Sequence, residues 1–205
     1  MAPIDLGVPI AFLEANRQAL LAITASGQLY SWDIKHQKAF FPPPTLSTIL
    51  SSSPNHTVLR ASVTSNGQPL IHVSNNVVYS YDPNILAFIK VTERWWAENS
   101  DAWNGRARAT TQGMSRGIMT LTEAALNSTD TSMSLGGNVE VPKPQWWSIA
   151  ITLGHLETRM HAIKLLNSSA EYRQVVLLYA KRIADEGFRA KAEELIKELF
   201  GPVFW

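Results

Sequence analysis

Residues 21–33, LAITASGQLYSWD, decide how the first part of the chain folds. Apolar residues occupy both halves of this stretch, and Ser26-Gly27 separates the halves in the way that a two-residue turn separates the strands of a β-hairpin. Outward from this hairpin, β-branched and apolar runs bounded by turn residues continue in both directions. The sequence therefore predicts four strands, at residues 9–15, 19–25, 28–33 and 39–41.

A second group of strands follows three prolines at 42–44 and a short apolar turn at 45–50. Asn66-Gly67 and Asn75-Asn76 divide this group at turn positions, which predicts strands at residues 59–64, 70–73 and 77–81. Each group has the length of a propeller blade, roughly 40 residues. We therefore expect residues 1–82 to form two antiparallel propeller-like blades. Two blades do not close a ring, so their edges require cover from elsewhere.

Residues 83–126 are predicted to form a tryptophan-rich, mainly helical connecting segment. Asp82-Pro83-Asn84 is a helix-start signal in which the aspartate is the cap and the proline is the first helical residue. A short second helix is predicted over residues 117–126. Residues 127–145 are rich in Ser, Thr, Gly and Pro and carry little apolar surface, which predicts a flexible linker.

The C-terminal part, residues 146–205, is predicted to form a three-helix bundle. Ser168 to Glu171 has the pattern of a capping box and opens the second helix, which ends at Gly187. The inward faces follow from helical periodicity. They are Ile149, Leu153, Leu156, Met160 and Ile163 in the first helix, Tyr172, Val175, Val176, Tyr179 and Ile183 in the second, and Ala192, Leu195, Ile196 and Leu199 in the third. The predicted fold class is therefore α+β.

The composition argues against several classes of function. With 18 Lys and Arg against 17 Asp and Glu, the chain has no overall field that would attract nucleic acid or an anionic membrane. It contains no cysteine, which removes thiol nucleophiles and thiolate metal sites and fits a reducing compartment. The sequence shows no secretory signal and no apolar run of membrane-spanning length. We therefore expect a protein of the cytosol or nucleus that has no contact with membranes.

No group of residues predicts a catalytic, cofactor, small-molecule or metal site. His155, Glu157 and His161 lie on one predicted helix, but residues two apart on a helix point about 200° apart. Only Glu157 and His161 share a face, and a surface ion pair explains them better than a metal ion does.

The densest basic patch consists of Arg106, Arg108 and Arg116. Such a patch can clamp phosphate or an acidic partner. A solvated loop is the simpler interpretation, because no aromatic residue that could stack on a base lies within the patch. Both interpretations stay open.

Tryptophan is abundant, with seven residues in a chain of 205, and two pairs are adjacent in the sequence. Adjacent side chains on a helix or strand diverge, so we expect one indole of each pair to be buried and the other to be available to a partner. Tryptophan also concentrates at the buried centres of interfaces. The candidate subunit-interface residues are Trp32, Asp33, Trp95, Trp96, Trp103, Trp146 and Trp147.

Several segments together resemble a known family. Residues 21–33 resemble a degenerate WD-repeat strand pair, and the motif WWAENSDAW occupies residues 95–103. The tail adds HLE at 155–157, SAEYR at 169–173 and ELFGP at 198–202. This order is similar to the C-terminal domain of HIRA, a histone-regulation corepressor and chaperone subunit. Members of that family also carry a complete WD-repeat propeller upstream, whereas Met1 opens directly on the C-terminal region here, which implies a fragment or an incomplete gene product.

The resemblance implies a non-catalytic subunit of a nuclear complex that deposits histones on DNA independently of replication and represses transcription. This domain would assemble the subunits by binding itself or a sister Hir-type subunit, and by binding the large helical-repeat subunit of the Hir complex. Histones would be bound only indirectly. The longest acidic runs, Asp185-Glu186 and Glu193-Glu194, are too short to grip a strongly basic protein.

Two other functions stay open at the level of sequence. A propeller-derived protein-interaction adaptor outside chromatin would share the predicted blades but would lack the helical ending. An enzyme is the second, because a catalytic triad is a spatial arrangement that residue spacing alone does not exclude.

Overall fold

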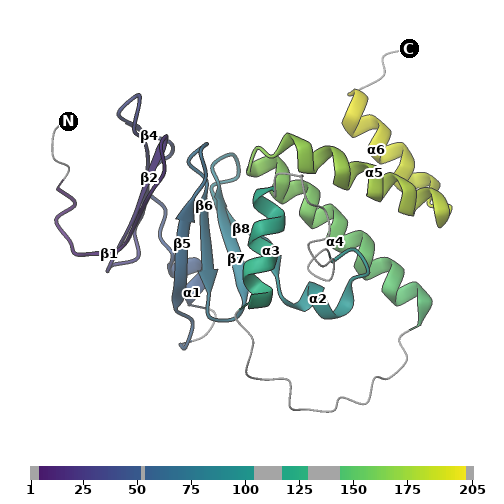
Figure 1. Ribbon diagram of the computed structural model, residues 1–205, viewed down its shortest axis with the longest axis horizontal. Helices are drawn as coiled ribbons and strands as arrows, with labels where there is room; N and C mark the ends of the chain where they lie inside the picture. Colours follow the sequence, from purple (N-terminus) through teal and green to yellow (C-terminus); the bar gives the residue numbers. More distant parts are fainter. Residues whose placement is uncertain (1–4, 52–53, 104–116, 129–143, 202–205) are drawn as a thin grey trace. The chain divides into compact units, whose positions relative to one another are not determined.

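The computed structural model describes residues 5–51, 54–103, 117–128 and 144–201. The chain divides into two compact units. The first contains the chain up to Glu93 together with Leu165–Asn167, and the second contains Arg94–Lys164 and the residues from Ser168 onward. Strands dominate the first unit and helices form the second (Figure 1). The predicted order, a β-rich part followed by a helical part, is therefore observed.

Two four-stranded antiparallel sheets form the first unit. Strands that follow one another in the sequence are neighbours in each sheet, as in a series of hairpins. A short helix, α1 (Ser47–Leu50), links the two sheets where the sequence predicts an apolar turn. The first sheet contains β1 (Ile10–Ala15), β2 (Ala19–Thr24), β3 (Leu29–Asp33) and β4 (Lys38–Ala39), and the second contains β5 (Val58–Val63), β6 (Pro69–Val73), β7 (Val77–Asp82) and β8 (Ala87–Glu93).

The same five-residue turn occurs once in each sheet, at Thr24–Gln28 and at Thr64–Gln68. In both turns the glycine N–H donates to the threonine carbonyl, and the glutamine N–H donates to the threonine hydroxyl at 3.0 Å. Gly27 and Gly67 have φ values of 80° and 79°, a left-handed conformation that favours glycine. The glycine forms a bulge beside the turn, so the first loop is longer by one residue than the two-residue turn predicted at Ser26-Gly27.

The two sheets share one apolar core. Ser31 on β3 also ties them together, because its hydroxyl donates to the Gly67 carbonyl at 2.7 Å in a buried position. A Cβ atom on Gly67 would lie 2.2 Å from the Phe40 ring, so close packing requires glycine at this turn. The core contains Leu21, Ile23, Leu29, Phe41, Leu46, Ile49, Ala61, Ile71, Val73 and Tyr81.

The prediction of a helix that begins at Asp82 is wrong, because residues 87–93 form strand β8. Asp82 Oδ1 accepts the backbone N–H of Asn84 at 2.9 Å, and Leu86 has a positive φ of 53°. The Asp-Pro-Asn motif therefore forms a turn instead of a first helical turn. β8 pairs with β7 along its whole length, and this pairing overrides the local helix-start signal.

Five helices are described after Glu93: α2 (Trp95–Asn99), α3 (Ile118–Ser128), α4 (Gln145–Leu165), α5 (Ser169–Asp185) and α6 (Arg189–Phe200). The short helix predicted over 117–126 and the three C-terminal helices are confirmed. Most of the predicted linker, residues 127–145, lies outside the described residues. Among the helices that are described, none combines the length and the apolar character needed to span a membrane.

The inward face predicted for α6 is only partly correct. Leu195 is 7% exposed, but Ile196 is 51% and Leu199 46% exposed. A terminal helix that packs along one side leaves its other sides in solvent. Ile196 and Leu199 therefore form, with the exposed Phe188 and Phe200, an apolar stripe on the outside of α6.

Candidate functional site

The first sheet carries an apolar face opposite the core. Residues that oppose one another in antiparallel strands share a face, and side chains alternate along each strand. Seven residues consequently lie on the side away from the core, and none of them is charged. This set, which we name the outer face, consists of Leu13, Ala22 and Tyr30 in one row and Ala15, Leu20, Trp32 and Ala39 in the next.

The outer face is partly open to solvent. Leu13 is 60% exposed, and Tyr30 and Trp32 are half-buried. The two aromatic rings stack on each other, with centroids 5.4 Å apart and an angle of 11° between their planes. Antiparallel sheets commonly place polar residues on the face that does not pack on the core. An uncharged, aromatic second face is instead typical of a contact surface.

Asp33, which follows Trp32, holds the turn after β3. Its carboxylate accepts the backbone N–H of His36 at 3.0 Å and lies 2.6 Å from His36 Nδ1. These hydrogen bonds lower the pKa of Asp33 below its ordinary value. Asp33 therefore fixes the conformation of the chain at the end of β3, the strand that carries Trp32 on the outer face.

Three of the predicted interface tryptophans meet in the second unit. The Trp95 ring lies 5.0 Å from the Trp96 ring and 6.3 Å from the Trp147 ring, edge to face in both cases. Trp95 is 43% exposed and Trp146 is 69% exposed, whereas Trp96 and Trp147 are half-buried. Each adjacent pair therefore presents one indole more openly than the other, as the divergence of neighbouring side chains requires.

Trp103 lies in the core of the second unit, where its side chain is 3% exposed. Its ring and the Trp96 ring both stack on the imidazole of His155, at centroid distances of 5.8 and 4.9 Å. Of the seven candidate interface residues, Trp103 therefore contributes to packing within its own unit and offers no free surface.

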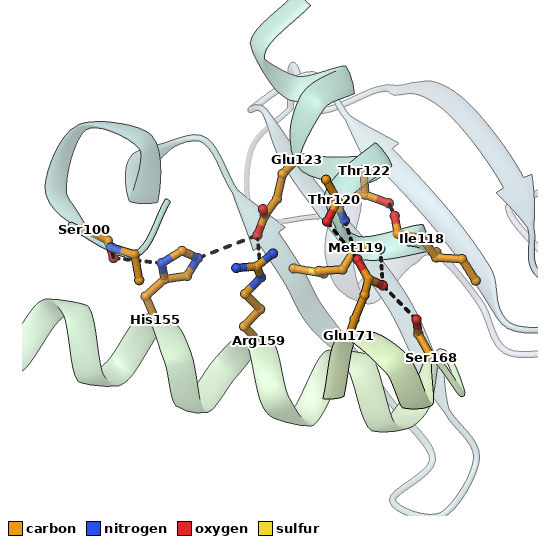
Figure 2. Close-up of polar contacts among 11 residues, drawn as sticks. Ser100, Ile118, Met119, Thr120, Thr122, Glu123, His155, Arg159, Ser168 and Glu171 are labelled. Carbon is orange, nitrogen blue, oxygen red and sulfur yellow. Dashed lines mark hydrogen bonds and ion pairs between the residues drawn. The ribbon is translucent and has the colours of Figure 1, made fainter. Parts of the chain in front are cut away.

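A buried polar network surrounds His155 (Figure 2). Ser100 Oγ lies 2.8 Å from His155 Nδ1 and accepts the Ala102 N–H, so the serine hydrogen is available to donate to that nitrogen. The other ring nitrogen, Nε2, faces Glu123 Oε1 at 3.8 Å. Arg159 Nε forms an ion pair with the same oxygen at 3.1 Å.

Ser100, His155 and Glu123 contact one another in the same order as the residues of a hydrolase triad, but their distances and burial differ from those of a triad. Ser100 is buried, and the 3.8 Å between His155 and Glu123 is too long for a hydrogen bond. The carboxylate is instead paired with a guanidinium. Removing one partner of a buried ion pair costs about 3–5 kcal/mol. The network therefore links α3, α4 and the segment after α2 into one unit.

Glu171 forms a second polar centre (Figure 2). Its carboxylate accepts the backbone N–H groups of Met119 and Thr120 at 3.1 and 3.0 Å, in the first turn of α3, and the Thr120 hydroxyl at 2.8 Å. It also accepts the Ser168 hydroxyl at 2.8 Å. Burial raises the pKa of Glu171, but the hydrogen bonds outweigh burial and the pKa is lowered. The motif at Ser168 thus correctly marks the start of α5, but the hydrogen bonds of a capping box do not form there, since Ser168 makes no side-chain cap hydrogen bond to α5. Its glutamate caps α3 instead.

The other residues weighed in the sequence do not form a site together. Glu157 and His161 line one pocket of the second unit, and the Glu157 carboxylate binds Tyr179 and Lys191. In the part of the chain that the structure describes, no three side chains gather as metal ligands. The predicted basic patch lies outside the described residues and consists of Arg106, Arg108 and Arg116.

Sequence reasoning missed the outer face and the His155 network. A signal for the outer face exists, because β2 and β3 carry apolar residues at successive positions, as in Leu20 and Leu21, and therefore on both sides of the sheet. No local signal predicts the network. Its members are far apart in the sequence and meet only when α3 packs on α4.

Comparison with known proteins supplies the family. A family model described as Hira, TUP1-like enhancer of split, matches residues 1–199. The chain belongs to the Hira family. This Hira-family chain is 32% identical over 213 residues to Protein HIR1 of Mycosarcoma maydis, which covers 94% of the chain and 21% of that relative. It is 28% identical over 233 residues to Protein HIR2 of Debaryomyces hansenii, which covers 98% of the chain and 23% of that relative.

A solved structure agrees with the fold of this Hira-family chain. The crystal structure of HIRA(644-1017) matches with a TM-score of 0.75 at 27% sequence identity, over 100% of this chain and 60% of that one. The chain spans about a fifth of the length of the curated relatives named above. The resemblance seen in the sequence is therefore confirmed.

Proposed function

We propose that this chain is a non-catalytic assembly domain of a nuclear histone-regulation complex, and that it binds a second copy of itself or a sister Hir-type subunit through the outer face of its first sheet. Membership of the Hira family and similarity to HIR1 and HIR2 proteins support the type of complex. The uncharged outer face, with Trp32 and Tyr30 stacked at its centre, supports the assembly role.

The residues of the outer face suit a protein interface. Full burial of a large apolar side chain stabilises an association by about 1.5–3 kcal/mol, and Leu13 retains most of its surface for that purpose. Tyr30 and Trp32 are stacked on each other before any partner arrives, so little side-chain entropy is lost on binding. Tyrosine and tryptophan are enriched at the centres of protein interfaces.

The remainder of the proposal follows from the family. The two sheets act as propeller-like blades whose free faces and edges are covered by other subunits. Helices α4, α5 and α6, which follow the sheets in the sequence, form a helical bundle. The partners include the large helical-repeat subunit of the Hir complex. Histones are reached only through the other subunits, and repression of transcription is a property of the whole complex.

The mass of the purified chain in solution tests the proposal. We expect sedimentation equilibrium to give a mass above the 22.8 kDa of one chain at micromolar concentration. Trp32→Ala and Leu13→Ser should both shift the mass towards the monomer, because they remove apolar surface from the outer face.

Leu177→Ser is the matched control, since Leu177 is an equally exposed leucine on α5. It should leave the mass unchanged. Circular dichroism establishes that each variant is folded. A wild-type chain that sediments as a monomer, together with outer-face variants that bind a sister Hir-type subunit as tightly as the wild type does, would overturn the proposal.

A further inference from the structure

Three buried polar side chains of the second unit meet without a complete set of hydrogen bonds. They are Trp103, Glu123 and His155, and each of them is 3% exposed or less. Among the residues that the structure describes, no hydrogen bond reaches Trp103 Nε1, His155 Nε2 or Glu123 Oε2. Buried polar atoms in folded proteins nearly always have a partner, which is either another protein group or an ordered water molecule. The three atoms therefore indicate a site for a small polar molecule.

The imidazole of His155 brings these side chains together. Its Nε2 atom lies 3.8 Å from Glu123 Oε1, which is too far for a direct hydrogen bond. The Trp103 ring stacks on the same imidazole, with centroids 5.8 Å apart. Polar atoms that face each other at more than about 3.5 Å are often bridged by water. A water oxygen about 2.8 Å from both atoms would form a triangle with Nε2 and Oε1.

The mixture of donors and acceptors determines which species fits this site. The Trp103 indole N–H only donates, whereas an ionised Glu123 carboxylate only accepts. The carboxylate repels an anion, and the indole N–H offers nothing to a cation. Arg159 already pairs with Glu123, and no third metal ligand gathers with His155 and Glu123 in the described part of the chain. Water, which both donates and accepts, satisfies all of these groups.

We propose that the second unit binds one internal water molecule that bridges Trp103 Nε1, His155 Nε2 and the Glu123 carboxylate. The water accepts a hydrogen bond from the indole N–H and donates one to the carboxylate. Either tautomer of His155 is compatible, because water can donate to Nε2 or accept from it. Buried waters typically make about three hydrogen bonds, which is the number that this site offers.

The bound water gives two sequence motifs a shared structural role. Trp96, Ser100 and Trp103, from the motif at residues 95–103, all contact His155, the first residue of the HLE motif. The water joins the end of the first motif to Glu123 on α3 and to His155 on α4. The two motifs therefore build a hydrated joint inside the second unit, which does not depend on the outer face of the first sheet.

A high-resolution crystal structure of the whole chain tests the proposal directly. We expect a well-ordered water molecule within hydrogen-bonding distance of His155 Nε2, Trp103 Nε1 and one oxygen of Glu123. A direct hydrogen bond between Nε2 and the carboxylate would overturn the proposal, and so would a protein group that accepts the indole N–H.

NMR of the indole protons provides a second test in solution. We expect a nuclear Overhauser effect between the Trp103 indole proton and water with the sign of a long-lived contact, and slow exchange of this proton with solvent. Trp103→Phe assigns the signal, because it removes the indole proton and keeps an aromatic ring.

Trp146 is the matched control in the same spectra, since its side chain is 69% exposed and its indole proton should exchange rapidly. A Trp103 proton that exchanges as fast as the Trp146 proton, or that shows no long-lived contact with water, would overturn the proposal. Trp32→Ala should leave the Trp103 signal unchanged, so this proposal and the assembly proposal fail separately.

Discussion

At the scale of single residues, the carboxylate of Glu171 caps the start of α3 from a position in the first turn of α5. It accepts two backbone N–H groups of α3 and lies in the first turn of its own helix, α5. Both positions place a negative charge at the positive end of a helix dipole. A Cβ atom on Gly117 would lie 1.9 Å from Glu171 Cδ, so the contact also requires a residue without a side chain just before α3.

Gly117→Ala should therefore destabilise the chain by about 1–3 kcal/mol, as overpacking does in a close-packed site. Gly154→Ala on α4 is the matched control, because a Cβ atom at position 154 meets nothing within 4 Å. That variant should instead stabilise the chain by about 0.5–1 kcal/mol through higher helix propensity. Urea unfolding of both variants measures the two effects, and equal changes in both would contradict this account of Gly117.

The lowered pKa of Glu171 predicts a pH dependence of stability. A carboxyl group whose pKa is lower in the folded chain than its ordinary 4.5 stabilises the fold above that value and loses its contribution as pH falls through the folded pKa. Glu171→Gln should therefore be less stable than the wild type at neutral pH. The difference should shrink below pH 4.5, which unfolding curves recorded across this range measure. A difference that is constant with pH would show that the charge is not involved.

At the scale of elements, apolar residues of α6 that periodicity predicts to face inward together differ in burial. Leu195 and Ile196 are neighbours with similar hydrophobicity, yet one is buried against the other helices and the other faces solvent. The physical reason is that α6 packs by one side only, and a rotation of about 100° per residue separates the two side chains.

Leu195→Ala should cost about 2–5 kcal/mol, because it leaves a cavity in a packed site. Ile196→Ala should change the free energy of unfolding by less than about 0.5 kcal/mol, as surface substitutions do. Thermal or urea unfolding of both variants measures these values. Similar losses in both would mean that Ile196 is packed in the isolated chain.

At the scale of the whole molecule, the proposed assembly is apolar, because the outer face is uncharged and the chain has a formal net charge of +1. Salt screens interactions between charges, with a Debye length that falls from about 10 Å at 0.1 M to about 3 Å at 1 M. The sedimentation mass should therefore stay unchanged over that range of sodium chloride. Dissociation at high salt would indicate an ionic interface elsewhere on the chain.

The sequence by itself determined those features whose causes are local. Turn residues such as Asn66-Gly67 fix where strands end, and apolar periodicity and the motif at Ser168 fix the three C-terminal helices, because these signals act within a few residues. The resemblance to the Hira family was also recognised from short sequence motifs, such as the one at residues 95–103. Local divergence of side chains predicted that one indole of each adjacent tryptophan pair would be more open than the other, but it did not determine which one.

Only the tertiary structure decided which surfaces are covered. β8 forms because β7 offers it a partner, Glu171 serves a helix about 50 residues away in the sequence, and Trp103 is buried by packing around His155. The outer face and the α6 stripe are exposed to solvent because no distant segment packs on them in the part of the chain that the structure describes. Burial depends on contacts between segments that are distant along the chain, and a pattern of residue types specifies a face without specifying what covers it.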